Sequence, residues 1–282
     1  MIPGLYIVST PIGNLKDITV RAVETLQKSN IILCEDTRVT QKLLEYHNIQ
    51  CDQIFTYNDH TNIKYDDKII NYINSGSIVS LVSDAGTPCI SDPGSRLINH
   101  CYKHKCYVDV VPGACSPISA LLLSGFAGNT FYFIGFLPKT DSQKCKLFEK
   151  LKTVNSALIF FETKHRLTKS LEIALDVLGD QKAAVVREMT KIYQEVQKNT
   201  LSNLLDYYKS LVANSKTVKG EIVLIIENNY EEKQLDTLGI TKEAMKMYKK
   251  GLSKRDITNI ISEKFCLKKQ EVYKVINQAI LE

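Results

Sequence analysis

The alternation of strand-like and helix-like segments is the feature of this sequence that most constrains its fold. Short apolar runs of the kind buried in a mainly parallel sheet alternate with amphipathic stretches through the first half of the chain. The expected strands are Leu5–Thr10, Ile31–Cys34, Ile78–Val82 and Tyr107–Val111. The expected helices are Ile18–Leu26, Gln41–Tyr46, Asp66–Ile73, Arg96–Tyr102 and Pro117–Ser124. This order of elements is typical of an α/β layer architecture.

A second alternating set begins at Thr130. We expect strands over Phe131–Gly135, Ala157–Phe161, Ala183–Arg187 and Glu221–Ile226, and helices over Lys144–Leu151, Leu167–Leu178 and Leu201–Leu211. At 282 residues the chain is long enough for two compact domains and an appendage. The sequence therefore predicts α/β domains over residues 1–125 and 126–230, then a polar segment over Glu227–Gln234 and a third module over 235–282.

The third module has helical periodicity and a basic charge. Ser253 can N-cap a first helix, and the link Cys266-Leu267-Lys268 precedes a second. Apolar residues repeat at helical spacing at Ile257, Ile260, Ile261 and Phe265, then at Val272, Val275, Ile276 and Ala279. Residues 235–282 carry +4 of the formal net charge of +5. We predict a basic helix–turn–helix-like module for RNA, with Lys268 and Lys269 as contacts; the alternatives are a solvated lysine-rich surface and a brace for a dimer.

Composition excludes several classes of protein. No apolar run approaches the ~20 residues of a membrane span, and the start of the chain lacks signal-peptide character, so we expect a cytoplasmic protein without a membrane partner. The eight scattered cysteines indicate reduced thiols. His100, Cys101, His104 and Cys106 could ligate zinc. A polar helix end explains the same residues, and the prediction is no metal.

Three loops rich in Pro and Gly follow predicted strands. They are Ser9–Leu15, Ser83–Gly94 and Pro112–Pro117. Ligands of open α/β sheets bind where loops leave the carboxyl ends of strands. Rigid Pro and permissive Gly allow backbone groups in such loops to approach a ligand closely. Ordinary turn chemistry explains any one of them, but three together at one sheet edge indicate a binding site. None matches a Walker or G-x-G-x-x-G sequence.

Eight motifs in these and later segments resemble a known family. They are S-T-P-I-G-N-L-x-D-I-T at 9–19, E-D-T-R at 35–38, S-D-A-G-T-P-x-I-S-D-P-G at 83–94, V-P-G at 111–113, G-F-L-P at 135–138, E-x-x-H-R-L at 162–167, R-E-x-T-K at 187–191 and G-E-I-V-L at 220–224. The set resembles the ribosomal RNA small subunit methyltransferase I family of the tetrapyrrole methylase superfamily, from about residue 4 to 227. The basic tail is similar to that family's C-terminal extension. After V-P-G this chain has A-C-S where the family commonly has P-S-A.

The resemblance implies two α/β domains of the tetrapyrrole-methylase type, in a homodimer, with S-adenosylmethionine in a cleft between them. It implies 2′-O-methylation of a cytidine ribose in the decoding region of 16S rRNA, free or in the small ribosomal subunit. Carried over residue by residue, the cofactor contacts are Pro11, Ser83, Asp84, Ala85, Thr87, Cys115, Ser116 and Glu162.

The reaction needs alignment of the 2′-oxygen with the methyl group and a base for the hydroxyl proton. Glu188 and Asp36 are the candidate bases, and for both a structural ion pair is the alternative. The candidate RNA contacts of the body are Arg38, Arg166, Arg187 and Lys191, while Arg96 could hold RNA or pair with a carboxylate. Two other functions remain open. One is methylation of a tetrapyrrole or other small molecule on the same fold, and the other is non-enzymatic regulation through the basic tail.

Overall fold

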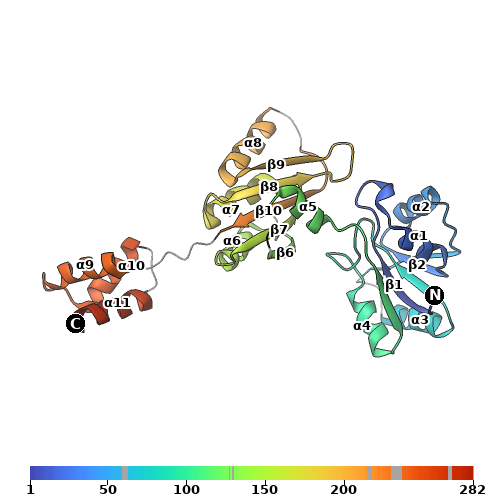
Figure 1. Ribbon diagram of the computed structural model, residues 1–282, viewed down its shortest axis with the longest axis horizontal. Helices are drawn as coiled ribbons and strands as arrows, with labels where there is room; N and C mark the ends of the chain where they lie inside the picture. The colour runs from blue at the N-terminus through green and yellow to red at the C-terminus, as the bar shows by residue number, and fades with distance from the viewer. Residues whose placement is uncertain are drawn as a thin grey trace. The chain divides into compact units, whose positions relative to one another are not determined.

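The computed structural model describes residues 1–58, 63–126, 128, 130–214, 218–229, 237–265 and 269–281. The chain divides into two compact units, Met1–Asn229 and Tyr230–Glu282. The described residues of the first unit build two five-stranded sheets, and those of the second unit build helices (Figure 1). This arrangement confirms the predicted fold class of two α/β domains followed by a helical C-terminal segment.

The first sheet is parallel throughout. Its strands are β1 (Gly4–Val8), β2 (Ile31–Cys34), β3 (Gln53–Thr56), β4 (Ile78–Leu81) and β5 (Tyr107–Val111), in the spatial order β3-β2-β4-β1-β5. Helices α1 (Val20–Gln27) and α2 (Thr37–Tyr46) share one apolar cluster with the sheet. Helices α3 (Ile63–Asn74) and α4 (Ser95–Lys103) share another. Because successive strand residues point to opposite faces, these two clusters cover the two faces of the sheet.

The strand order brings the three Pro/Gly loops together. Strands β4, β1 and β5 are neighbours, and the loops follow these three strands. The carboxyl ends of parallel strands meet at one sheet edge, so the loops emerge side by side. A short 3₁₀ helix, η1 (Leu15–Asp17), ends the first loop, where the Asn14 side chain accepts a hydrogen bond from the Lys16 N–H.

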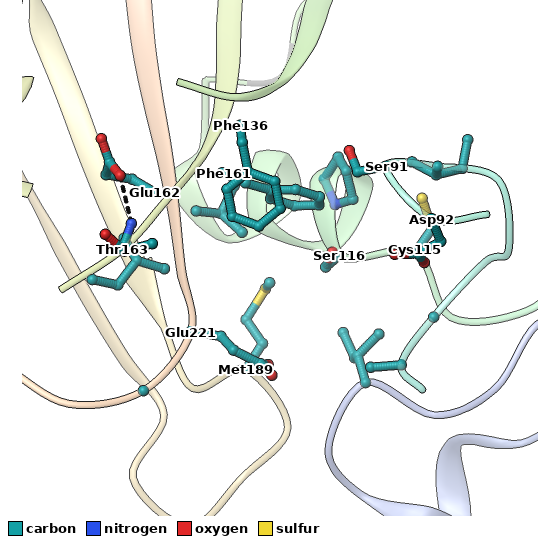
Figure 2. A pocket seen from close by; sticks show the side chains of 18 of the residues that line it. Ser91, Asp92, Cys115, Ser116, Phe136, Phe161, Glu162, Thr163, Met189 and Glu221 are labelled. Carbon is teal, nitrogen blue, oxygen red and sulfur yellow. Dashed lines mark hydrogen bonds between the residues drawn. The ribbon is translucent and has the colours of Figure 1, made fainter. Parts of the chain in front are cut away.

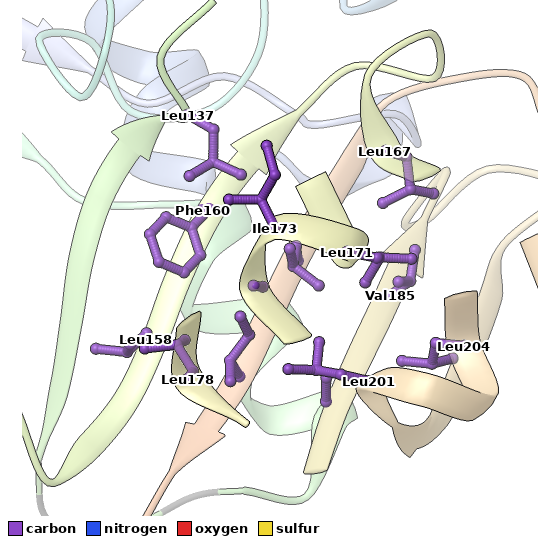
Figure 3. Close-up of a cluster of buried hydrophobic side chains, with 14 of the residues drawn as sticks. Leu137, Leu158, Phe160, Leu167, Leu171, Ile173, Leu178, Val185, Leu201 and Leu204 are labelled. Atoms are coloured by element: carbon purple, nitrogen blue, oxygen red, sulfur yellow. The ribbon is translucent and has the colours of Figure 1, made fainter. Parts of the chain in front are cut away.

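The second sheet is mixed. Its strands are β6 (Phe131–Phe136), β7 (Ser156–Glu162), β8 (Lys182–Arg187), β9 (Glu195–Thr200) and β10 (Ile222–Asn228), in the order β6-β7-β10-β8-β9. Strand β6 runs parallel to β7, and the other neighbours are antiparallel. Helices α6 (Asp141–Leu151), α7 (Leu167–Leu178) and α8 (Leu201–Ala213) cover one face. Figure 3 shows α7 leucines such as Leu171 packed against Phe160 and Val185 of the sheet.

Helix α5 (Ser116–Ser124) covers the other face of the second sheet. Ala120 and Leu121 pack against Ile159 and Val186 in one apolar cluster. In the chain α5 follows β5, the last strand of the first sheet, but it packs on the second sheet. Helix α5 therefore connects the two sheets of the first unit. Gly125 ends the helix in the left-handed conformation, with φ 65°. The boundary at residue 125 stays a prediction.

Two strands lacked a clear sequence signal. Strand β3 has half-exposed residues, and β9 reads E-V-Q-K-N-T. Each lies at the edge of its sheet. An edge strand is paired on one side only and tolerates polar residues, so apolar periodicity does not reveal it.

The C-terminal unit contains α9 (Thr237–Tyr248), α10 (Lys254–Phe265) and α11 (Lys269–Leu281). Among the described side chains of this unit, six buried ones form an apolar core: Ile240, Ala244, Ile257, Ile261, Val272 and Ile276. The sequence predicted the last two helices but not α9, and Ile260 is exposed rather than part of the core. The predicted link at 266–268 lies outside the described residues. No helix among the described residues is long and apolar enough to cross a membrane.

Candidate functional site

Hydrogen bonds join the three Pro/Gly loops into one surface. Thr10 and Gly86 exchange two backbone hydrogen bonds, of 2.9 and 3.1 Å. The Thr87 hydroxyl lies 3.0 Å from the Ser9 hydroxyl and donates to the Ala114 carbonyl at 3.0 Å. These bonds connect segments that are far apart in the chain, and they fix backbone groups around the loops before any ligand arrives.

The loop after β4 has an unusual backbone conformation. Gly86 and Gly94 have φ values of 87° and 133°, and the non-glycine residues Cys89 and Ser91 have 67° and 70°. A Cβ at Gly94 would lie 2.5 Å from Leu81 Cδ2, so only glycine fits there without rearrangement. Non-glycine residues in the left-handed region cost about 1–3 kcal/mol each and cluster at functional sites. The strained backbone of this loop therefore indicates a functional role for this edge of the sheet.

The first loop also contacts the turn after β8. The Asn14 N–H donates to Thr190 Oγ1 at 2.9 Å, and a Cβ on Gly13 would lie 2.6 Å from the same oxygen. In this turn Glu188 and Thr190 have φ values of 51° and 62°. The motifs S-T-P-I-G-N and R-E-x-T-K, about 180 residues apart, thus meet at one place.

A cavity of about 560 Å³ opens among these loops and the second sheet (Figure 2). Ser91, Asp92, Cys115 and Ser116 line it from the loops of the first sheet. The second sheet and its loops add apolar, sulfur-containing and polar groups: Phe136, Phe161, Glu162, Thr163, Lys164, His165, Met189, Gly220, Glu221, Ile222 and Val223. An apolar pocket of this size with a few convergent polar groups is typical of a site for a small ligand.

Asp92 is the carboxylate of the cavity with a strongly altered proton affinity. Burial raises its pKa to about 6, the charge of Asp84 adds to this rise, and a hydrogen bond with Ser83 opposes it. A cation placed beside such a carboxyl favours its ionised form. The sequence analysis did not single out Asp92, although it lies within the S-D-P-G part of the second loop motif.

The cavity contains five of the eight predicted cofactor residues. They are Ala85, Thr87, Cys115, Ser116 and Glu162. The other three, Pro11, Ser83 and Asp84, are not among the lining residues. Pro11 is buried next to the lining residue Ile12. The Ser83 hydroxyl donates to the Gly86 carbonyl at 3.2 Å, and Asp84 Oδ1 accepts from the Asp36 N–H at 3.1 Å.

The Glu162 carboxylate makes hydrogen bonds and an ion pair with neighbouring groups of its own domain. It accepts from the Thr163 N–H at 2.6 Å and from the Ser170 hydroxyl, and it pairs with Arg166 at 2.9 Å. Arg166 also donates to the Leu137 carbonyl at 3.3 Å. The pair stabilises the turn between β7 and α7, whose residues Thr163, Lys164 and His165 line the cavity.

The predicted base Glu188 directly precedes the lining residue Met189, and its carboxylate forms an ion pair with Lys191. Its carboxylate accepts from Lys191 Nζ at 2.9 Å and from the Glu221 N–H at 3.0 Å. Partial burial would raise its pKa, but these two hydrogen bonds and nearby positive charge outweigh that effect and lower it. Lys191 also pairs with Glu221 at 3.1 Å. A Cβ at Gly220 would lie 2.3 Å from the Glu188 side chain, so this glycine makes room for the carboxylate.

The second predicted base, Asp36, lies outside the cavity lining. Asp36 caps α2 by accepting from the Arg38 N–H at 2.9 Å, and its side chain pairs with the Arg38 guanidinium at 2.6 Å. Hydrogen bonds from Arg38 lower the pKa of Asp36 to about 2. The Arg38 side chain is 85% exposed.

The remaining predicted contacts lie at several places. Arg187 pairs with Glu195 and donates to the Lys219 carbonyl at 2.7 Å. Arg96 pairs with the buried Asp66 at 2.8 Å, as its structural alternative predicted. Lys269 is exposed at the start of α11, and Lys268 lies outside the described residues.

Sequence reasoning missed Phe136, Phe161, His165 and Met189. Phe136, His165 and Met189 belong to motifs that were noted, and Phe161 immediately precedes another. Their position in the cavity depends on the packing of the two sheets, which the motifs alone do not specify.

Comparison with known proteins identifies the family of this chain. The family model for Tetrapyrrole (Corrin/Porphyrin) Methylases matches residues 4–205. The chain is 44% identical over 277 residues to ribosomal RNA small subunit methyltransferase I of Rickettsia prowazekii, covering 98% of this chain and 96% of the relative. It is 36% identical over 275 residues to the protein of that name from Bacillus subtilis, covering 95% and 92%.

Solved structures share the fold at low sequence identity. A diphthine synthase aligns with TM-score 0.60 and 14% identity, covering 79% of this chain and 89% of its own. Uroporphyrin-III C-methyltransferase from Thermus thermophilus, complexed with S-adenosyl homocysteine, aligns with TM-score 0.52 and 17% identity, covering 79% and 96%. The chain belongs to the tetrapyrrole methylase family and, within it, to the ribosomal RNA small subunit methyltransferase I group.

Proposed function

We propose that this protein transfers a methyl group from S-adenosylmethionine to the ribose 2′-oxygen of a cytidine, cytidine 1402 in the family, in the decoding region of 16S rRNA. The observation that carries the proposal is the cavity between the three joined loops and the second sheet, in a chain that matches rRNA small subunit methyltransferases I over almost its full length. The cytoplasm, where ribosomes are assembled and work, is the proposed location.

The cavity suits S-adenosylmethionine in size and chemistry. Its volume of about 560 Å³ lies in the usual range for small-molecule sites. Adenosine requires an apolar slot with nearby hydrogen-bonding groups, which Phe161, Ile222 and the loop backbone provide. The positively charged part requires an anionic neighbour, for which Asp92 is available. We propose Pro11, Ser83, Asp84, Ala85, Thr87, Cys115, Ser116 and Glu162 as cofactor residues, of which Pro11, Ser83 and Asp84 lie outside the cavity lining, and add Asp92.

Bound S-adenosylmethionine supplies an activated methyl group, so the protein's main task is alignment. The joined loops hold their backbone groups in place through the Thr10–Gly86 and Thr87–Ala114 hydrogen bonds. Apolar side chains of Ile12, Phe161 and Met189 exclude water from the reacting atoms. Glu188 is the proposed base for the 2′-hydroxyl proton, because its neighbours Met189 and Glu221 line the cavity. Asp36 remains the second candidate.

Two features of the surface support an RNA substrate. Arg38 is largely exposed, and Ile192 and Tyr193 are 95% and 76% exposed on the turn next to Thr190. Lys191 lies two positions before Tyr193, and an exposed aromatic ring near a cationic group is a common platform for a nucleotide base. We propose that Arg38, Arg166, Arg187 and Lys191, each of which is also held in an ion pair, contact RNA around the cavity, and that the C-terminal unit adds Lys268 and Lys269.

Exposed apolar side chains support a homodimer. Leu122 on α5 is 67% exposed, and Phe131 and Tyr132 on β6 are 45% and 53% exposed. These apolar side chains are available to a partner, and most soluble oligomers are homo-oligomers.

Methyl transfer to defined substrates tests the proposed function. Purified protein would be incubated with radiolabelled S-adenosylmethionine and either small subunits lacking the modification, naked 16S rRNA, or a uroporphyrinogen-type tetrapyrrole. We expect label in rRNA, and primer extension at limiting nucleotide concentration should locate a 2′-O-methyl group at a decoding-region cytidine. Label in the tetrapyrrole would transfer the assignment to small-molecule methylation. Retention of random duplex DNA in a gel without any methyl transfer would favour a regulator.

A further inference from the structure

Three potential metal ligands lie together on helices α3 and α4, away from the cavity. They are Asp67 on α3, His100 in the last turn of α4 and His104 at the C-cap of α4. One ligand atom of each residue lies within 4.8 Å of one atom of the other two. Asp67 Oδ1 is 2.8 Å from His100 Nε2, and the two imidazole rings have centroids 4.6 Å apart. The two helices thus present three convergent donors.

This donor set suits a transition-metal ion. Imidazole nitrogen and carboxylate oxygen both bind Zn²⁺ at about 2.0–2.2 Å, which requires ligand atoms roughly 3.3 Å apart in a tetrahedral site. Asp67 Oδ1 and His100 Nε2 are 2.8 Å apart in a direct hydrogen bond, so these two atoms would have to separate by about 0.5 Å to admit the ion. The remaining ligand-atom distances are within 4.8 Å, and His104 is exposed. Histidines at i and i+4 lie on one face of a helix and form a chelating pair.

The thiols near this cluster do not belong to it. Cys101 is fully buried, and it packs in the apolar cluster between the first sheet and its helices. The Cys106 thiol lies 3.9 Å from Asn74 Oδ1 and 3.9 Å from the His104 carbonyl oxygen. Of the four residues considered from sequence, His100 and His104 therefore remain candidate ligands, and Cys101 and Cys106 do not. Asp67, 33 positions before His100, provides the third donor.

The cluster lies at the edge of the first sheet opposite the cavity. Helix α4 starts directly after the loop that lines the cavity and ends just before β5 begins. Its last turn is therefore at the amino end of the parallel strands. Arg96 on α4 already pairs with Asp66 on α3, so a metal ion at Asp67 would extend the connection between the same two helices.

We propose that Asp67, His100 and His104 form a structural binding site for Zn²⁺, with water completing the coordination shell, that fastens α3 to α4. The ion reaches this site from solvent, since the side chains of Asp67 and His100 are 55% and 18% exposed. The site is separate from the proposed methyl transfer, and its test does not depend on that activity.

Isothermal titration of the full-length protein with ZnCl₂ tests the site. The protein would be freed of affinity tag and dialysed against a chelator, and MgCl₂ would serve as the cation that prefers all-oxygen ligands. We expect one strongly bound Zn²⁺, no Mg²⁺ binding of comparable strength, and a saturable rise in melting temperature with Zn²⁺. Asp67→Asn and His104→Ala should each weaken the affinity by at least about tenfold.

Two control variants test whether the loss of Zn²⁺ binding is specific to the proposed ligands. Lys103→Ala changes an exposed residue of the same helical turn, and Cys106→Ser removes the nearby thiol. Both should bind Zn²⁺ like the unsubstituted protein, and melting curves without metal should show that all four variants are folded. The proposal is overturned if the unsubstituted protein binds no stoichiometric Zn²⁺, if Asp67→Asn and His104→Ala bind it unchanged, or if only Cys106→Ser loses binding.

Discussion

The backbone N–H of Asn14 donates a 2.9 Å hydrogen bond to the hydroxyl of Thr190, 176 positions later in the chain. Thr190 holds a left-handed backbone conformation in the same turn as Glu188. This bond connects the first Pro/Gly loop of the parallel sheet to the turn that carries the proposed base. The proposed cofactor loops and the turn with the proposed base are thus in direct contact through these two motifs.

Gly86→Val should weaken S-adenosylmethionine binding at least tenfold. Gly86 lines the cavity with φ 87°, and a Cβ there would lie 3.2 Å from Ile12 Cγ2, so a branched side chain enters the ligand's space. Gly76→Val is a matched control, since Gly76 has φ 94° and nothing within 4 Å of its Cβ position. Both variants pay about 1–2 kcal/mol of backbone strain. Equal cofactor affinity for the two variants in calorimetry would contradict the assignment of the loop.

Asp92 should make cofactor affinity depend on pH. Its pKa of about 6 exceeds the ordinary value of 3.8, so the folded protein binds more protons than the unfolded chain between these values and loses stability as pH rises through them. A cation beside Asp92 lowers its pKa, so binding releases a proton and strengthens from about pH 5 to pH 7. Asp92→Asn should abolish this trend and should be more stable than the unsubstituted protein above pH 6. Calorimetry in two buffers measures the released proton, and an unchanged trend in Asp92→Asn would exclude this role.

Glu188→Gln should reduce turnover by roughly two to four orders of magnitude, the usual range for a general base, with little change in cofactor affinity. Asp36→Asn is its matched comparison, because both carboxylates are ion-paired and have lowered pKa values. We expect less than about a threefold change for Asp36→Asn. Single-turnover methylation rates distinguish the two: the reverse order would make Asp36 the base, and small effects in both would leave both carboxylates structural.

Tyr193→Ala should weaken rRNA binding by about 1–3 kcal/mol, the range for loss of one base-stacking partner. Tyr193 is 76% exposed on the turn beside the cavity. Tyr102→Ala, at 62% exposure on α4, is the control for loss of an exposed tyrosine elsewhere. Filter binding to rRNA gives the affinities. Equal losses in the two variants would argue against a specific contact at Tyr193.

Removal of the C-terminal unit should weaken RNA binding and flatten its dependence on salt. The unit has its own apolar core and divides from the rest at Tyr230, so a chain ending at Asn229 should fold and bind the cofactor normally. Each lost lysine–phosphate contact reduces the slope of log affinity against log salt by about 0.7–0.9. Replacing Lys268 and Lys269 with Ala should produce part of this change. An unchanged slope together with loss of the dimer in sedimentation would show that the unit braces the dimer instead.

Local patterns in the sequence predicted most of the elements and the motif loops. Leu167–Leu178 is a helix with the predicted bounds, because an apolar stripe at helical spacing is a local property of the chain. The edge strands Gln53–Thr56 and Glu195–Thr200 were missed, since pairing with a neighbour stabilises them more than their own residue types do. Helix α9 was missed as well, and its Ile240 and Ala244 are buried against the two helices that were predicted.

The sequence by itself determined the α/β class, the helical tail and the three Pro/Gly loops, because residue spacing and turn chemistry act over a few neighbouring positions. Only the tertiary structure decided what these parts contact. The order β4-β1-β5 places the three loops together. Lys191 Nζ donates a hydrogen bond to the Glu188 carboxylate, and Asp67 on α3 contacts His100 on α4. Such contacts depend on how distant segments pack, and the burial and charge that shift the pKa of Asp92 arise only when those segments have come together.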